Sequence, residues 1–281
     1  MNVNQLKRHV TDMLAGTVGG EEAAAMSREI IRHLLGLEPA QAVLAGDRPV
    51  ETLTEQAAER IVKRVNDGEP LQYVLGSAYF MGMEFKVTPA VLIPRPETSQ
   101  LVDIITDDMR GRQNLRVLDV GTGSGCIAIS LCRALPFAEV SGMDISAEAL
   151  AVARENGAAM KTPVRWLQAD ILTLSPQPGS YDVIVSNPPY IAESEKTSMD
   201  PRVYDHEPHT ALFVPDSDPL RFYRAIAHFA ATALAGDGVL YFEINPLFVD
   251  GLRHILSGAG FDNVDIIRDF RGNYRFAVCR R

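Results

Sequence analysis

The first third of the chain places its hydrophobic residues at helical spacing. Apolar side chains recur every three or four positions over residues 3–14 and again over 23–35, and a period of about 3.6 residues predicts amphipathic helices. A third helix is predicted after them, capped by Thr54 and with Glu55 in its first turn. We therefore interpret residues 1–70 as a small helical bundle.

Residues 71–96 change from a helical to an extended pattern. The stretch YFMGMEFKV has β-prone residues on both sides of Gly82, which predicts a short hairpin. The stretch TPAVLIPRPET follows, and its three prolines stiffen the backbone. Because this segment is apolar, we interpret it as a connection between two domains that packs against the protein.

From residue 97 onward, short hydrophobic runs alternate with helical patterns. The runs are RVLDV (116–120), EVSGMD (139–144), VRWLQA (164–169), YDVIVS (181–186) and GVLYFEI (238–244). Apolar strands separated by helices are typical of a parallel sheet covered on both faces. Two final runs, 263–268 and 274–280, flank a short loop and predict an antiparallel hairpin. The predicted fold class is therefore α/β, with a mixed seven-stranded sheet over 97–281.

Composition narrows the class of protein. Hydrophobic residues make up 46% of the chain and charged residues 22%, as in ordinary globular proteins. No run approaches the roughly 20 apolar residues of a membrane span, and the first residues form an amphipathic pattern rather than a signal sequence. The three cysteines show no metal-binding spacing, and their odd number argues against a disulfide framework. We therefore expect a cytoplasmic protein without membrane contact.

The net charge of −9 bears on binding partners. Binding to nucleic acid depends mainly on neutralising phosphates, so proteins that bind duplexes usually carry a basic face. The basic cluster near the end of this chain is modest, and it consists of Arg268, Arg271, Arg275, Arg280 and Arg281. Direct binding of nucleic acid is therefore not expected.

A glycine-rich turn follows the first predicted strand of the sheet. Ligands of open parallel sheets bind at the carboxyl ends of the strands, where glycines let the backbone approach them and a helix N-terminus presents free N–H groups. A dinucleotide fingerprint would need a glycine at position 126, which is Cys126. The spacing here resembles the loop of S-adenosylmethionine-dependent methyltransferases, although a tight structural turn gives the same letters. The predicted cofactor loop is Gly121, Thr122, Gly123, Ser124 and Gly125.

Two acidic residues end the next two predicted strands. Asp144 is placed to accept hydrogen bonds from both hydroxyls of an adenosine ribose. The alternative role for Asp144 is a cap on the helix that opens near Ser146. Asp170 follows the third strand, where members of this methyltransferase class use an acidic residue and its neighbour to hold adenine. That neighbour is Ile171, so the implied contact is apolar rather than a ring stack.

The fourth predicted strand ends abruptly in Asn187-Pro188-Pro189-Tyr190. Prolines stiffen the chain as it leaves the sheet, and the plainest interpretation is a strand terminator. The four residues also resemble the [D/N]PP[Y/F/W] motif of methyltransferases that act on planar nitrogens. Such a nitrogen is a poor nucleophile because its lone pair is delocalised. We expect the Asn187 side-chain oxygen and the Pro188 carbonyl to accept its two N–H groups beside the cofactor, while Tyr190 packs against the substrate.

A wider resemblance covers nearly the whole chain. PLQYVLGSAYFMGMEF followed by LIPRPET is similar to the corresponding stretch of the HemK/PrmC family, the protein-(glutamine-N5) methyltransferases of peptide chain release factors. GTGSG, SNPPY and a later EP...AL pattern (Glu207, Pro208, Ala211, Leu212) match as well. The resemblance implies a Rossmann-like methyltransferase domain that uses S-adenosyl-L-methionine to methylate the glutamine of a Gly-Gly-Gln motif. It also implies that Arg95, Pro96 and Glu97 lie near the cofactor and the catalytic loop, where Arg95 is expected to contact the substrate.

One stretch departs from the family pattern. Relatives commonly have a glycine after the Glu-Ile pair of FEINPLF, where this chain has Asn245-Pro246. The departure leaves the role of Glu243 open. The sequence pattern divides the chain into a helical domain at 1–70, a hairpin and linker at 71–96 and a methyltransferase domain at 97–281. Because no candidate chemistry falls within residues 1–70, we expect that domain to recognise the protein substrate. We expect the protein to be a monomer.

Three other functions compete with this hypothesis. A methyltransferase for a ribosomal-protein glutamine would share the NPPY motif. An N6-adenine DNA methyltransferase would need a target-recognition segment and a basic groove, and neither is evident. A non-catalytic protein that retains the cofactor fold is opposed by the intact glycine loop. His206 and His209 are two histidines without a third ligand at suitable spacing, so no metal is predicted.

Overall fold

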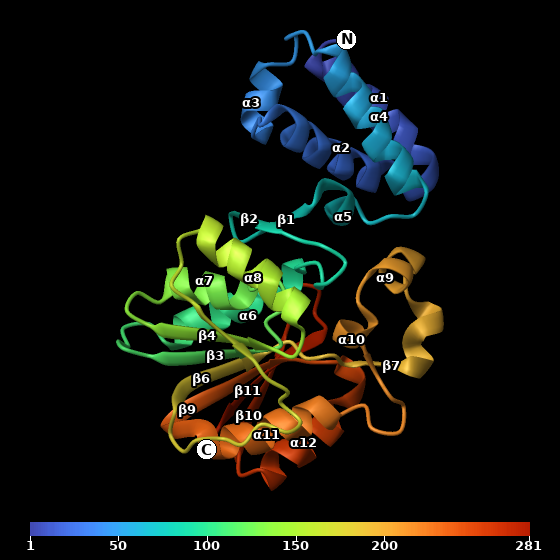
Figure 1. Ribbon diagram of the computed structural model, residues 1–281. Helices are drawn as coiled ribbons and strands as arrows, with labels where there is room; N and C mark the ends of the chain where they lie inside the picture. Colours follow the sequence, from blue (N-terminus) through green and yellow to red (C-terminus); the bar gives the residue numbers. More distant parts are fainter. The chain divides into compact units, whose positions relative to one another are not determined.

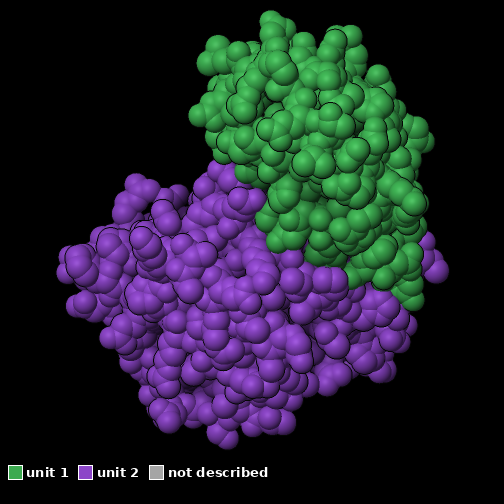
Figure 2. All heavy atoms as spheres, turned by 45° about the horizontal axis from the view of Figure 1, so that its top comes forward, with its two compact units in different colours: residues 1–77, 200–206 green, residues 78–199, 207–281 purple. Residues whose placement is uncertain are grey.

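The computed structural model describes the backbone of residues 1–281 and every side chain except those of Pro39 and Ser198. The residues form two compact units, shown in green and purple in Figure 2. The first comprises Met1–Ser77 and Asp200–His206, and the second comprises Ala78–Met199 and Glu207–Arg281. None of the helices among the described residues is long and apolar enough to cross a membrane.

The first unit is helical. Its helices are α1 (Val3–Val18), α2 (Gly20–Leu35), α3 (Pro39–Leu44), α4 (Thr52–Asn66), α5 (Leu71–Leu75) and α9 (Pro201–His206) (Figure 1). Helix α1 begins with a capping box, in which Asn2 and Gln5 each accept the other's backbone N–H. The apolar faces of α1, α2 and α4 meet in one buried cluster. Arg202 of α9 reaches Glu22 of α2 at 2.7 Å within this unit.

The prediction that Thr54 caps the third helix is wrong. Helix α4 begins at Thr52 after the extended residue Glu51, and the Thr54 backbone N–H donates to the Glu51 carbonyl. Thr54 therefore lies inside the first turn. The short helix α3 precedes α4 and was not predicted, because six residues are too few to show a helical period.

The second unit contains the predicted seven-stranded mixed sheet, and this prediction is confirmed. Its strands are β3 (Arg116–Val120), β4 (Glu139–Asp144), β5 (Arg165–Gln168), β6 (Tyr181–Ser186), β9 (Leu234–Glu243), β10 (Asn263–Arg268) and β11 (Tyr274–Arg280). Their order is β10-β11-β9-β6-β3-β4-β5, and β11 pairs antiparallel with both of its neighbours. The chain runs outward from β3 to β5 and then returns to place β6 on the other side of β3. The topological switch point, where ligands of such sheets bind, therefore lies between β3 and β6.

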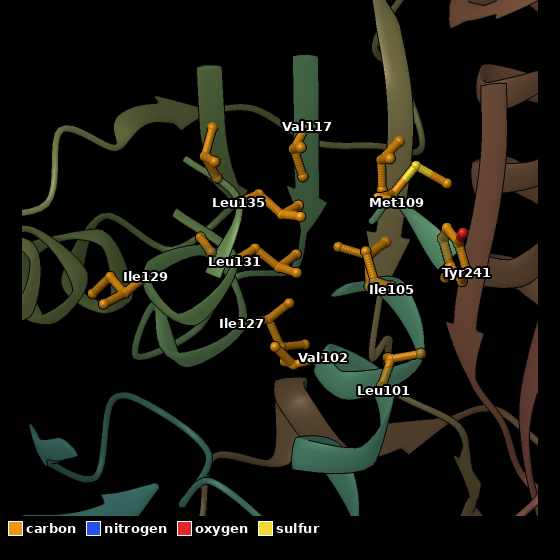
Figure 3. Close-up of a cluster of buried hydrophobic side chains, with 14 of the residues drawn as sticks. Leu101, Val102, Ile105, Met109, Val117, Ile127, Ile129, Leu131, Leu135 and Tyr241 are labelled. Atoms are coloured by element: carbon orange, nitrogen blue, oxygen red, sulfur yellow. The ribbon is translucent and has the colours of Figure 1, made fainter. Parts of the chain in front are cut away.

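Helices cover both faces of this sheet (Figure 1). One face carries α6 (Pro96–Asp108), α7 (Cys126–Ala134) and α8 (Ala147–Ala159), and the other carries α11 (Arg221–Ala233) and α12 (Val249–Gly258). Figure 3 shows part of the first layer, where Leu101 and Ile105 of α6 lie near Ile127 of α7 and Val117 of β3. Burial of these side chains fixes the helices whose first turns border the switch point.

Shorter elements complete the second unit. They are the ribbon of β1 (Ser77–Phe80) and β2 (Met83–Lys86), the parallel pair β7 (Ile191–Ala192) and β8 (Phe213–Val214), α10 (His209–Leu212), and the 3₁₀ turns η1 (Glu193–Ser198) and η2 (Pro246–Phe248). The predicted hairpin around Gly82 is confirmed, and Gly82 has a left-handed φ of 75°. Asn156 of α8 bonds both backbone groups of Lys86 and the Ser124 carbonyl, which joins the end of β2 to the glycine loop.

Candidate active site

A cavity of about 390 Å³ opens at the carboxyl ends of the parallel strands. Its lining comes from the turns after β3, β4, β5 and β6, from residues 90–95, from Thr98 in the first turn of α6, and from side chains between residues 210 and 226. The predicted residues that line it are Arg95, Gly121, Thr122, Gly123, Ser124, Asp144, Asp170, Ile171, Asn187, Pro188 and Pro189. Gly125 and Tyr190, which were also predicted, are not part of the lining. The volume is typical of a site for a small-molecule ligand.

The three glycines of the loop have different surroundings. All three adopt left-handed φ angles, of 74°, 55° and 82° at Gly121, Gly123 and Gly125. A Cβ added at Gly121 or Gly123 would meet no atom within 4 Å, so these positions leave open space beside the cavity. A Cβ at Gly125 would come within 2.8 Å of the Trp166 ring. Gly121 and Gly123 thus leave space for a ligand beside the loop, and Gly125 leaves space for the Trp166 ring.

Asp144 is held at the end of β4 with its carboxylate beside the glycine loop. Its Oδ2 accepts from the Gly123 backbone N–H at 2.9 Å, and its Oδ1 accepts from that of Ser146 at 3.0 Å. Ser146, not Asp144, is the N-cap of α8, because its hydroxyl accepts from the Ala149 N–H. Each carboxylate oxygen can accept more than one hydrogen bond, so Asp144 keeps acceptor capacity for a ligand.

Asp170 and Ile171 follow β5 on the rim of the cavity. Asp170 Oδ1 accepts from the Leu172 backbone N–H at 2.9 Å, which fixes the turn. Ile171 packs against the buried cluster that lies on the α11 side of the sheet. The pair therefore presents one acidic and one apolar group to the cavity.

Asp119, inside β3, is a buried acid that the sequence reasoning did not single out. Its Oδ2 accepts from the Thr122 hydroxyl at 2.6 Å and from the Ala128 N–H at 3.2 Å, so it supports the glycine loop from beneath. Burial raises the pKa of Asp119 to about 7. An acidic residue within the otherwise apolar run RVLDV was the signal that could have revealed it.

Asn187 leaves the end of β6 and lines the cavity. The preceding residue, Ser186, donates its hydroxyl to the Val120 carbonyl at 2.7 Å, which ties this end of β6 to β3. The Asn187 amide nitrogen donates to the Thr98 hydroxyl over a long 3.5 Å. Pro188 and Pro189 follow on the cavity wall. The structure therefore brings Asn187 and the glycine loop to one cavity.

Tyr190 points to a buried polar group behind the cavity wall. Its hydroxyl donates to Glu243 Oε1 at 3.3 Å and accepts from Arg275 Nη1 at 3.5 Å. Burial is the main cause of the raised pKa of Tyr190, so the phenol stays a neutral donor. The predicted contact between the Tyr190 ring and a substrate stays a prediction.

Glu243, whose role the sequence left open, is only 2% exposed. Its Oε2 accepts from the Thr98 hydroxyl at 2.7 Å, while Oε1 accepts from Tyr190. Burial raises the pKa of Glu243, and the hydrogen bonds and Arg275 oppose that shift. Asn245, two residues later, donates from Nδ2 to the Tyr190 carbonyl and to Glu195 Oε1, each at 3.0 Å. The sequence could not reveal these contacts, because they join residues that are fifty or more positions apart.

Arg95 lies on the cavity wall in an ion pair with Glu207. The distance from Arg95 Nη2 to Glu207 Oε1 is 2.5 Å, and the Glu207 side chain is 1% exposed. Glu207 Oε2 also accepts from the Ile93 N–H at 3.3 Å. The two stretches IPRPET and EP...AL, which carried part of the resemblance, therefore meet at this pair.

These residues fit S-adenosylmethionine. The open positions at Gly121 and Gly123 give a ligand access to the loop backbone, and Asp144 offers a carboxylate beside Gly123 that can accept from ribose hydroxyls. Apolar side chains including Ile145 and Ile171 give the same cavity surfaces for an uncharged ring. The cavity can thus hold a ligand with hydroxyl groups and an aromatic ring next to Asn187.

Comparisons with known proteins agree with this site. A family model described as the PrmC N-terminal domain matches residues 5–76, and one described as the methyltransferase small domain matches residues 97–202. The crystal structure of a methyltransferase from Pyrococcus furiosus superposes with a TM-score of 0.50 at 18% identity, covering 71% of this chain and 89% of that one. This likeness shows the fold alone.

Curated relatives are similar over almost the entire chain. A release factor glutamine methyltransferase of Bacteroides thetaiotaomicron is 41% identical over 280 residues, which is 99% of this chain and 100% of the relative. A protein of the same description from Flavobacterium psychrophilum is 36% identical over 98% of both chains. The family that the sequence resemblance indicated is thereby confirmed. The chain belongs to the release factor glutamine methyltransferase family.

Proposed function

We propose that this protein transfers a methyl group from S-adenosyl-L-methionine to the side-chain amide nitrogen of the glutamine in the Gly-Gly-Gln motif of peptide chain release factors. The observation that carries the proposal is the position of Asn187, whose side chain lines the same cavity as the glycine loop and Asp144. The names of the relatives, which match over nearly all of the chain, give the substrate class.

The cofactor half of the cavity is assigned from its donors and acceptors. S-adenosylmethionine supplies an electrophilic methyl group when it is bound. Backbone groups of residues 121–124 approach the ligand, and Asp144 accepts from the ribose hydroxyls. Asp170 and Ile171 hold the adenine through one polar and one apolar contact. Asp144 keeps its orientation because the Gly123 and Ser146 N–H groups fix both of its oxygens.

The substrate half orients an amide that reacts poorly in water. The lone pair of an amide nitrogen is delocalised into the carbonyl, so the nitrogen must be aimed at the methyl group. Asn187 Oδ1 and the Pro188 carbonyl accept the two N–H groups. Positive charge develops on the nitrogen as the new bond forms, and acceptors already in place stabilise that charge without reorganising. The two prolines limit relaxation of these acceptors.

The helical unit is proposed to recognise the release factor. It contains no residue of the cavity, and it exposes large apolar side chains at Val43, Leu44 and Leu53, with exposed fractions of 73%, 89% and 72%. Exposed apolar side chains of this size in one small unit favour contact with a partner protein. The proposed state of the enzyme is a monomer in the cytoplasm.

Mapping the methylated residue tests the function. The protein is incubated with labelled S-adenosylmethionine and, in separate reactions, with an intact release factor, with ribosomal proteins and with duplex DNA. We expect label on the release factor, located by mass spectrometry at the glutamine of Gly-Gly-Gln. Label confined to a ribosomal protein or to adenine would establish one of the alternative substrates and refute the proposal.

A further inference from the structure

The two ends of the Asn187–Tyr190 turn are connected to one carboxylate. Glu243 Oε2 accepts from Thr98, whose hydroxyl is also the group that Asn187 Nδ2 contacts. Glu243 Oε1 accepts from Tyr190 directly. Thr98 and Glu243 are 3% and 2% exposed, so water does not compete for these hydrogen bonds.

The bridge through Thr98 determines which way the Asn187 amide faces. A threonine hydroxyl has a single proton, and the Thr98 hydroxyl donates it to Glu243 Oε2 at 2.7 Å. Only lone pairs of the Thr98 oxygen then remain for Asn187. The Asn187 side chain must turn its NH₂ group toward Thr98, which directs Oδ1 away from Thr98.

We propose that Glu243 and Thr98 are positioning residues for methyl transfer, which hold the Asn187 amide with its oxygen toward the substrate nitrogen. The inference rests on the proposed function, since it concerns the acceptor of the glutamine N–H group. If the amide were reversed, its NH₂ group would face the N–H groups of the substrate and repel them. Glu243 also fixes the far end of the turn through Tyr190, and Arg275 supports that contact at 3.5 Å.

The first test removes the Thr98 hydroxyl while keeping its shape. Thr98→Val should lower the single-turnover rate of release-factor methylation by roughly tenfold, the upper range for losing one hydrogen bond, with an unchanged Kd for S-adenosylmethionine. Thr98→Ser should recover most of that rate. Thr106→Val is the matched control, because it makes the same change on α6 where the hydroxyl donates to the Val102 carbonyl.

A double-variant comparison separates positioning from simple support of the fold. If Thr98 acts through Asn187, Thr98→Val should have almost no further effect on the rate in an Asn187→Ala background. Two effects that multiply would show that Thr98 acts independently and would overturn the inference. A Thr98→Val rate equal to wild type would do the same.

Glu243→Gln provides a second variant of nearly the same shape. Its side-chain NH₂ must face either Thr98 or Tyr190, so at least one of the two hydroxyls can no longer donate to residue 243. A Thr98 hydroxyl released in this way no longer fixes the orientation of the Asn187 amide, and the rate should fall. The midpoint of thermal unfolding should not fall along with the rate, because a buried carboxylate is costly to ionise and the variant removes it. A lower midpoint with an unchanged rate would assign Glu243 a structural role only. Absence of methylation by the wild-type chain would instead refute the proposed function itself, and this inference with it.

Discussion

The Asn245 side chain donates to the Tyr190 backbone carbonyl at 3.0 Å and thereby joins the end of β9 to the NPPY turn. Asn245 is the residue at which this chain departs from the family pattern. It is 5% exposed, and its Oδ1 accepts from the Leu247 N–H at 3.0 Å. The Asn245 side-chain oxygen thus caps η2, and its nitrogen donates hydrogen bonds to Tyr190 and Glu195.

We therefore expect Asn245→Ala to destabilise the protein. It removes three hydrogen bonds at a buried position, and the expected loss in the free energy of unfolding is about 1–3 kcal/mol. Denaturation in urea measures that loss. Asn263→Ala, at an exposed position that begins β10, is the control and should change stability little. Equal midpoints for the two variants would show that the Asn245 contacts carry no net stability.

Asp144→Ala should weaken binding of S-adenosylmethionine while leaving the fold intact. The variant loses a charged acceptor for the ribose hydroxyls, and losing one such hydrogen bond corresponds to roughly a 10- to 100-fold increase in Kd. Calorimetric titration measures the Kd. Asp262→Ala removes an exposed carboxylate outside the cavity lining and serves as the control. An unchanged Kd for Asp144→Ala would contradict the ribose assignment.

Asp119 should make the stability of the cofactor-free protein depend on pH. The folded pKa of Asp119 is about 7, above the ordinary value of 3.8. Between these two pH values, the folded protein keeps a proton on Asp119 that the unfolded chain has released. Its contribution is fully present below the unfolded pKa and is lost as pH rises through the folded pKa. Between pH 5 and 8, Asp119→Asn should gain roughly 2–3 kcal/mol in unfolding free energy relative to wild type. Parallel pH profiles of the two proteins would show that Asp119 ionises as readily folded as unfolded.

The exposed apolar residues of the helical unit should contribute to methylation of an intact release factor but not to methylation of a short peptide. Replacing Val43, Leu44 and Leu53 with serine should lower kcat/KM for a whole release factor by roughly tenfold or more, because fully burying one exposed Val or Leu side chain contributes about 1.5–3 kcal/mol. Methylation of a short peptide containing Gly-Gly-Gln should stay unchanged. Phe137→Ser, before the amino end of β4, is the control. Equal losses for peptide and protein would place recognition elsewhere.

Local patterns were enough to predict the sheet, and most of the predicted site residues line the cavity. The strands at 263–268 and 274–280 end where the apolar alternation ends, and the glycine and proline motifs lie at strand ends because their backbone requirements are local. Thr98, Glu243 and Asn245 could not be given roles in this way. Their hydrogen bonds depend on the strand order, which brings α6 and the end of β9 behind the NPPY turn, and no periodic pattern encodes that arrangement.

Single-turnover methylation by Asn187→Ala is the most direct test of the account. If Asn187 Oδ1 accepts a glutamine N–H group as charge develops on the nitrogen, the rate should fall by about 10²–10³, as for the loss of one preorganised acceptor or donor in other enzymes. The Kd for S-adenosylmethionine should change much less, because we propose that the glycine loop and Asp144 carry most of that binding. Measuring one turnover prevents product release from masking the chemical step. A rate near that of wild type would show that the NPPY turn only ends a strand, and would contradict the mechanism.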